Sequence, residues 1–231
     1  MLDRAKHIQN FLKPELVEFL TNYIYLCKKV SETSNTNKYL EGDGQVSGAK
    51  FVTYGDIAID SLLETYFPKI QEVWDKKLYP SFTYARIYGA GTGLDMHRDR
   101  IGSDVTCSVK LSGPPFPFVI NGEEGSAERP QHYIISQGDA LVWNGNKYTH
   151  GHSDEISEEG LHLLLICTEY EDHIYDKRKH LGLLPETREG KEGYDYKDPT
   201  YGHDETNDFL TTRNTNAVSY THLTLPTILL V

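Results

Sequence analysis

The sequence contains few cysteines and no long apolar run. The three cysteines are far apart along the chain, at Cys27, Cys107 and Cys167. Their odd number and wide spacing argue against a disulfide framework and against a cysteine-rich zinc site. No apolar stretch reaches the length of a membrane-spanning helix, and the N-terminus lacks the apolar block of a signal peptide. We therefore expect a soluble cytoplasmic protein with no membrane partner.

Positive charge is also scarce. The 231 residues include 23 Lys and Arg against 34 Asp and Glu, which gives a formal net charge of −11. Such a surface repels phosphate backbones, and the sequence shows no basic stripe. It therefore predicts no nucleic-acid partner, whereas its 38% of hydrophobic residues suffice for one globular core.

The hydrophobic periodicity changes once along the chain. Apolar residues recur at helical spacing after Pro14 and again after Asp56, which we interpret as the N-cap of a second helix. From residue 82 the pattern becomes one of short strands separated by turn residues. This order predicts an α+β fold in which an N-terminal helical support region, residues 1–80, packs on one sheet of a β core at residues 81–172.

The C-terminal quarter of the chain lacks such periodicity. Residues 173–217 are polar and highly charged, and we expect a surface extension that is partly disordered. Residues 218–231 resemble the translation of a sequencing-library adapter, so we expect a non-native tail there. The alternative for this last segment is a genuine C-terminal strand.

The pair with the clearest chemistry is His97 and Asp99. On an extended strand, side chains two residues apart share a face but lie about 6.6 Å apart. Two ligands of one metal must lie closer, so we expect the strand to end and bend at this pair. His150 or His152, several strands later, supplies a third ligand. Two imidazoles and a carboxylate form the facial triad of non-haem Fe(II) oxygenases, although Mn(II) and catalytic Zn(II) also accept these ligands.

The sequence around these residues resembles a known family. The run Tyr88-Gly-Ala-Gly-Thr-Gly-Leu-Asp-Met-His97-Arg-Asp99 is similar to the iron-binding strand of the prolyl-hydroxylase-like 2-oxoglutarate/Fe(II)-dependent dioxygenases. Val105–Leu111 resembles the next strand of that family, and Gln137–Trp143, His150 and Leu161–Thr168 resemble its closing section. The resemblance covers residues 82 to 170 and implies a jelly-roll core, also called a double-stranded β-helix.

The resemblance assigns roles by position. It implies that His97, Asp99 and His150 bind the iron, and that Tyr88 and Lys110 lie beside the co-substrate. The family usually places an Arg or Lys about ten residues beyond the third ligand, where it pairs with the distal carboxylate of 2-oxoglutarate. Here His162 stands nearest to that position, and no Arg occurs between His150 and Arg178. Either Lys110, Arg86 or His162 supplies the charge, or the co-substrate is not 2-oxoglutarate.

The implied activity is hydroxylation of a peptide side chain, of prolyl type, or of a small molecule. This reaction uses Fe(II) and 2-oxoglutarate and gives succinate and CO2 as co-products. Ascorbate is an optional reductant. Asp99 favours hydroxylation, because halogenases of this superfamily lack that carboxylate. Two alternatives stay open: a cupin-like barrel that binds a metal or ligand without 2-oxoglutarate turnover, and a β-sandwich interaction module. The sequence does not define the oligomeric state.

Overall fold

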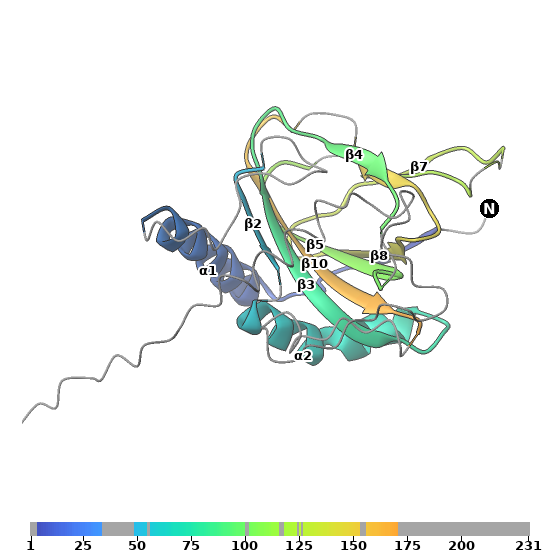
Figure 1. Ribbon diagram of the computed structural model, residues 1–231, viewed down its shortest axis with the longest axis horizontal. Coiled ribbons are helices and arrows are strands. Elements are labelled where there is room, and N and C mark those ends of the chain that lie inside the picture. The colour runs from blue at the N-terminus through green and yellow to red at the C-terminus, as the bar shows by residue number, and fades with distance from the viewer. Residues whose placement is uncertain are drawn as a thin grey trace, which may run out of the picture.

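The described part of the chain forms two antiparallel β-sheets with two helices on one side (Figure 1). The computed structural model describes residues 4–170, with gaps at 34–48, 55, 100–101, 116–117, 124, 126 and 153–155. In spatial order, the larger sheet contains β1 (Ala5–Ile8), β8 (Ala140–Asn144), β5 (Val105–Ser112), β10 (Gly160–Thr168), β3 (Tyr79–Tyr88) and β2 (Phe51–Tyr54). The smaller sheet contains β4 (Leu94–His97), β9 (His150–His152), β6 (Phe118–Ile120) and β7 (Gln131–Tyr133).

Helices α1 (Pro14–Thr33) and α2 (Ile57–Val73) cover the face of the larger sheet that points away from the smaller one (Figure 1). The side chain of Asp56 caps α2 as the sequence predicts, because it accepts hydrogen bonds from the N–H groups of Ala58 and Ile59. Neither described helix is long and apolar enough to cross a membrane. Both helices share one buried apolar core with the sheet, which includes Val17, Leu20, Ile24, Ile59, Leu63, Ala85, Val109 and Leu163.

The strands of the larger sheet alternate between this core and the space between the sheets. In β5, the residues that face the helices are Val105, Cys107, Val109 and Leu111. The intervening Thr106, Ser108 and Lys110 therefore face the smaller sheet. A second apolar cluster fills part of that inner space and includes Tyr84, Tyr88, Leu94, Phe118, Ile120, Leu141 and Trp143. The inner space is therefore lined by both polar and apolar side chains.

The structure agrees with the sequence on the general architecture and adds strands to it. The expected strands between residues 82 and 170 are present, and they form the two antiparallel sheets that a jelly-roll requires. Within residues 1–80, which we expected to be helical, β1 and β2 form the two edges of the larger sheet. The predicted extension at 173–217 and the predicted tail at 218–231 lie outside the described residues.

Candidate metal centre

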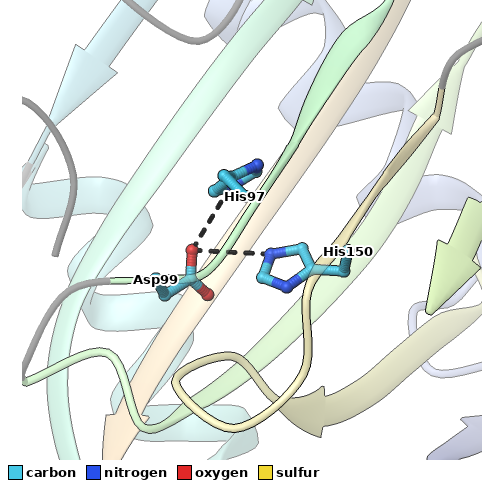
Figure 2. Close-up of side chains that lie close together, drawn as sticks. All are labelled: His97, Asp99 and His150. Carbon is cyan, nitrogen blue, oxygen red and sulfur yellow. Dashed lines mark ion pairs between the residues drawn. The ribbon is translucent and has the colours of Figure 1, made fainter. Parts of the chain in front are cut away.

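The side chains of His97, Asp99 and His150 meet between the sheets (Figure 2). β4 and β9 are antiparallel neighbours, and His97 lies directly opposite His150 in their register. Residues opposite one another on neighbouring strands point to the same face, so the two imidazoles are side by side. Nε2 of each histidine lies 3.5 Å from Oδ1 of Asp99. All three candidate ligand atoms lie within 4.8 Å of one another.

The chain bends between His97 and Asp99, as the sequence requires if both are to reach one metal. β4 ends at His97. Two residues later, the backbone N–H of Asp99 donates to the carbonyl of Gly145, at 3.0 Å. This hydrogen bond ties the end of β4 to the segment that follows β8, and the Asp99 carboxylate thereby faces both imidazoles.

Both histidines are held in the tautomer that a metal needs. Nδ1 of His97 donates to the carbonyl of Asp95 at 2.7 Å, and Nδ1 of His150 donates to the carbonyl of Tyr148 at 2.8 Å. A carbonyl oxygen can only accept, so Nδ1 carries the proton in each ring. In the neutral imidazole, Nε2 then has a lone pair to offer a metal, whereas a proton carried by Nε2 would point at Asp99 instead. Hydrogen bonds of this kind orient most metal-binding histidines.

The Asp99 carboxylate is held by a neighbour on the larger sheet. The Thr106 hydroxyl donates to Oδ2 of Asp99 at 2.6 Å, which leaves Oδ1 facing the histidines. Burial by itself raises the pKa of Asp99, but the neighbouring His150 and His97 outweigh it and hold the pKa well below its usual range. The group is therefore ionised at neutral pH, as a metal ligand must be.

Close packing leaves Asp99 little freedom. A Cβ atom on Gly145 would lie 2.0 Å from Oδ2 of Asp99, so any larger residue at position 145 would displace this carboxylate. On the other side, the ring of His150 packs against Trp143 and Phe118, with centroid separations of 5.1 and 5.8 Å. The site is thus walled by aromatic rings on the side of His150.

The three side chains fit a divalent first-row metal. Imidazole and carboxylate ligands suit Fe, Mn and Zn. Bonds of about 2.1 Å would place neighbouring octahedral donors about 3 Å apart, so the two 3.5 Å separations from Asp99, in a set that lies within 4.8 Å, would shorten on metal binding. His97 and Asp99 retain 18% and 15% side-chain exposure, whereas His150 is 2% exposed. The open side of the site therefore lies at His97 and Asp99.

A row of basic side chains lies deeper between the sheets. His162 on β10 lies opposite Lys110 on β5 and opposite Arg86 on β3, so the three side chains form a row across the central strands. All three are buried. Arg86 donates to the hydroxyls of Tyr84 and Tyr88, at 3.1 and 3.0 Å. We call Lys110, His162 and Arg86 the basic row.

Lys110 is the unusual member of the basic row. It is only 4% exposed, and within the described part of the chain its ammonium group forms no ion pair or hydrogen bond. Burial lowers the pKa of Lys110. Lysine side chains are rarely this buried unless they are paired, and such groups in native proteins usually serve a purpose. The basic row thus offers positive charge to an anion.

His162 is uncharged in these surroundings. Burial lowers the pKa of His162 to about 3, and the nearby His152, Lys110 and Arg86 contribute to the same effect. Its Nδ1 lies 3.3 Å from the hydroxyl of Ser108. Without that shift, a histidine would titrate near neutral pH.

One layer of side chains separates the basic row from His97, Asp99 and His150. His152 lies two residues beyond His150 on β9, a rise of about 6.6 Å. Its ring packs against the ring of Tyr88 at 5.3 Å, and Tyr88 packs edge-on against His162 at 5.7 Å. His152 and Tyr88 thus connect the metal-binding residues to the basic row.

The structure thus brings the sequence-predicted residues into two adjacent groups. The first group contains His97, Asp99 and His150, and the second contains Tyr88, Lys110 and His162. His152 lies between the two groups rather than against Asp99.

Sequence reasoning missed two residues that hold Asp99, namely Thr106 and Gly145. Thr106 had a detectable signal, because it shares a strand face with Ser108 and Lys110, whereas the contact of Gly145 arises only in three dimensions.

Solved structures match this arrangement at low sequence identity. No family model and no curated protein matches the sequence. A prolyl-4-hydroxylase from Pseudomonas putida aligns with a TM-score of 0.54 at 12% identity, over 72% of this chain and 93% of its own. The non-haem α-ketoglutarate-dependent epimerase SnoN of nogalamycin biosynthesis gives 0.54 at 12% identity, over 72% and 79%.

A third solved structure binds a peptide. The prolyl hydroxylase from Trichoplax adhaerens, in complex with a peptide fragment of the hypoxia-inducible-factor oxygen degradation domain, has a TM-score of 0.53 at 12% identity, over 72% of this chain and 84% of its own. These proteins differ in their reactions, so what they share with this chain is the fold. The resemblance expected from the sequence is confirmed at that level: the chain has the jelly-roll fold of the 2-oxoglutarate- and Fe(II)-dependent oxygenases.

Proposed function

We propose that this protein is an Fe(II)- and 2-oxoglutarate-dependent dioxygenase that hydroxylates a peptide side chain or a small molecule. The observation that carries the proposal is the meeting of His97, Asp99 and His150, with both Nε2 atoms facing one carboxylate oxygen. Three protein ligands on one side of an octahedral metal leave positions for a chelating co-substrate and O2. Bound there, Fe(II) would supply the activation of O2 with release of succinate and CO2.

The roles of the residues around the metal follow from their contacts. His97, Asp99 and His150 would hold the ion, and the hydrogen bonds from Nδ1 and from Thr106 would fix their orientation. Trp143 and Phe118 would exclude water on the side of His150. Substrate would approach from the open side, where His97 and Asp99 remain partly exposed.

The basic row would bind the distal carboxylate of 2-oxoglutarate. Lys110 is the strongest candidate for a direct ion pair, because it is buried and has no carboxylate partner in the described part of the chain. Arg86 holds the Tyr88 hydroxyl through its own hydrogen bond, which places that hydroxyl beside the basic row. The usual terminal-strand arginine would thus be replaced by charge from two other strands.

A peptide substrate of prolyl type is the more specific part of the proposal. Two of the aligned structures are prolyl hydroxylases and one of these holds a peptide, whereas SnoN is an epimerase of a biosynthetic route. The test is to incubate the Fe(II)-bound protein and 2-oxoglutarate with proline-containing peptides. Peptide-stimulated succinate formation and the gain of one oxygen atom would support this substrate class; stimulation by small molecules alone would contradict it.

One observation favours a second function: His162 stands where the family usually has the arginine that binds 2-oxoglutarate. A cupin-like barrel would bind metal or ligand at the same three residues without turning over 2-oxoglutarate. Anaerobic addition of Fe(II) and then 2-oxoglutarate separates the two, because chelation gives a visible metal-to-ligand absorption band. We expect this band together with succinate on exposure to O2. Metal binding without the band would favour the cupin-like function and reject the oxygenase.

A further inference from the structure

The basic row contains one residue that is uncharged at neutral pH but can accept a proton when its surroundings change. His162 stands between Lys110 on β5 and Arg86 on β3. Arginine is permanently charged, but an imidazole gains or loses its proton according to its surroundings. A family member with an arginine at this place would hold a fixed positive charge, so a histidine changes how the basic row responds to an anion.

An anion beside His162 would reverse the electrostatic balance there. The groups that face it are Lys110, Arg86 and His152, together with the Tyr88 ring and the Ser108 hydroxyl. The three basic groups disfavour a proton on the imidazole. A carboxylate that neutralises Lys110 removes part of this repulsion and adds attraction. At 4 Å and an effective dielectric constant of about 20, this attraction alone raises the pKa of an imidazole by about three.

The contact with Ser108 allows the change of charge. A hydroxyl both donates and accepts hydrogen bonds, so Ser108 can pair with Nδ1 of His162 whether or not that nitrogen carries a proton. In the protonated ring, Nδ1 donates to Ser108 and Nε2 donates to the incoming carboxylate. No rearrangement of the strand is needed.

We propose that His162 is a specificity-determining residue that takes up a proton from solvent when a dicarboxylate binds, and then pairs with the distal carboxylate as an imidazolium beside Lys110. The inference rests on the proposed function, since it takes the co-substrate to be a diacid held at the metal by its other end. It predicts that binding of 2-oxoglutarate is coupled to proton uptake. An arginine at this position would show no such coupling.

The test is calorimetry of 2-oxoglutarate binding to the anaerobic Fe(II)-bound protein, in buffers that differ in ionisation enthalpy. From a pKa of about 3 raised by about three, we expect uptake of about half a proton per chain at pH 6, falling below about a tenth at pH 8. His162→Gln and His162→Arg should each bind 2-oxoglutarate without proton uptake. If His162→Gln still takes up a proton when 2-oxoglutarate binds, another group accepts that proton and the inference is overturned.

A second measurement observes the protonation state of His162 directly. With Zn(II) as a diamagnetic metal, the ring nitrogens of 15N-labelled histidine report their protonation by NMR. Addition of 2-oxoglutarate at about pH 6 should move one histidine, absent from the spectrum of His162→Arg, toward the imidazolium shifts. Binding without proton uptake would overturn this inference alone. Failure of 2-oxoglutarate to bind to the metal-bound protein would overturn the proposed function as well.

Discussion

The Thr106 hydroxyl donates to Oδ2 of Asp99, and the other carboxylate oxygen, Oδ1, faces the imidazoles of His97 and His150. This hydrogen bond crosses from the larger sheet to the end of β4, so it couples the packing of the two sheets to the geometry of the site. Asp99 would therefore bind a metal through one oxygen, while the other oxygen is held by the protein.

Replacement of Thr106 by valine tests this coupling. Thr106→Val keeps the shape of the side chain and removes the hydroxyl, so Asp99 loses its orienting partner. We expect Fe(II) affinity to fall about 10- to 100-fold, in the range found for outer partners of metal ligands, with a loss of about 1 kcal/mol in stability. Anaerobic metal titration measures the affinity. Thr106→Ser is the control, since it retains the hydroxyl; an unchanged affinity in Thr106→Val would contradict this role.

Gly145 offers a steric test of the same carboxylate. In Gly145→Ala the new Cβ would lie 2.0 Å from Oδ2 of Asp99, so the carboxylate must move away from the histidines. We expect Fe(II) affinity to fall about 100-fold or more while the chain still folds. Gly160→Ala is a matched control, because its nearest neighbour would be 3.5 Å away, an ordinary contact. Equal effects of the two substitutions on metal affinity would contradict the prediction.

Lys110→Met separates co-substrate binding from metal binding. Methionine keeps an apolar stem in the same space and removes the buried charge. We expect the dissociation constant for 2-oxoglutarate to rise about 30-fold or more, with no loss of Fe(II) affinity. The thermal midpoint should not fall, because an unpaired buried ammonium group disfavours folding. Unchanged 2-oxoglutarate affinity would show that Lys110 does not bind the co-substrate. The assignment of the metal ligands would not be affected.

The low pKa of His162 predicts a pH dependence of stability. Below pH 6.5 the unfolded chain binds a proton at this residue, whereas the folded chain does not until about pH 3. Stability is therefore lost as the pH falls through this window. Between pH 6.5 and pH 4, the free energy of unfolding of His162→Gln should therefore fall by about 3 kcal/mol less than that of the original chain. Urea unfolding at several pH values measures the difference, and parallel curves for the two proteins would contradict a neutral buried His162.

The sequence predicts the strands after residue 82 well, because turn residues separate short apolar runs there. It misses β1 because four residues at a sheet edge pair with β8, more than 130 positions away. It misses β2 because Phe51–Tyr54 follows a polar stretch and, among the described residues, pairs with β3 alone. Local patterns carry no information about such distant partners.

The site was predictable in its ligand types but not in its details. His150 and His152 both point inward on β9, so periodicity alone cannot choose between them; the pairing of His150 with His97 does. The polar face of β5 was equally compatible with solvent and with a pocket. Burial of Lys110 depends on the smaller sheet packing over it, which no local pattern reveals.

The most direct test of the central claim is anaerobic Fe(II) titration of the original chain and of the double variant His97→Ala/Asp99→Ala, followed by a succinate assay in the presence of 2-oxoglutarate and O2. We expect one Fe(II) per chain and succinate formation in the original protein. In the variant, both should be lost while the far-ultraviolet circular dichroism stays the same. Iron binding of equal affinity, or succinate formation that persists in the double variant, would contradict the account.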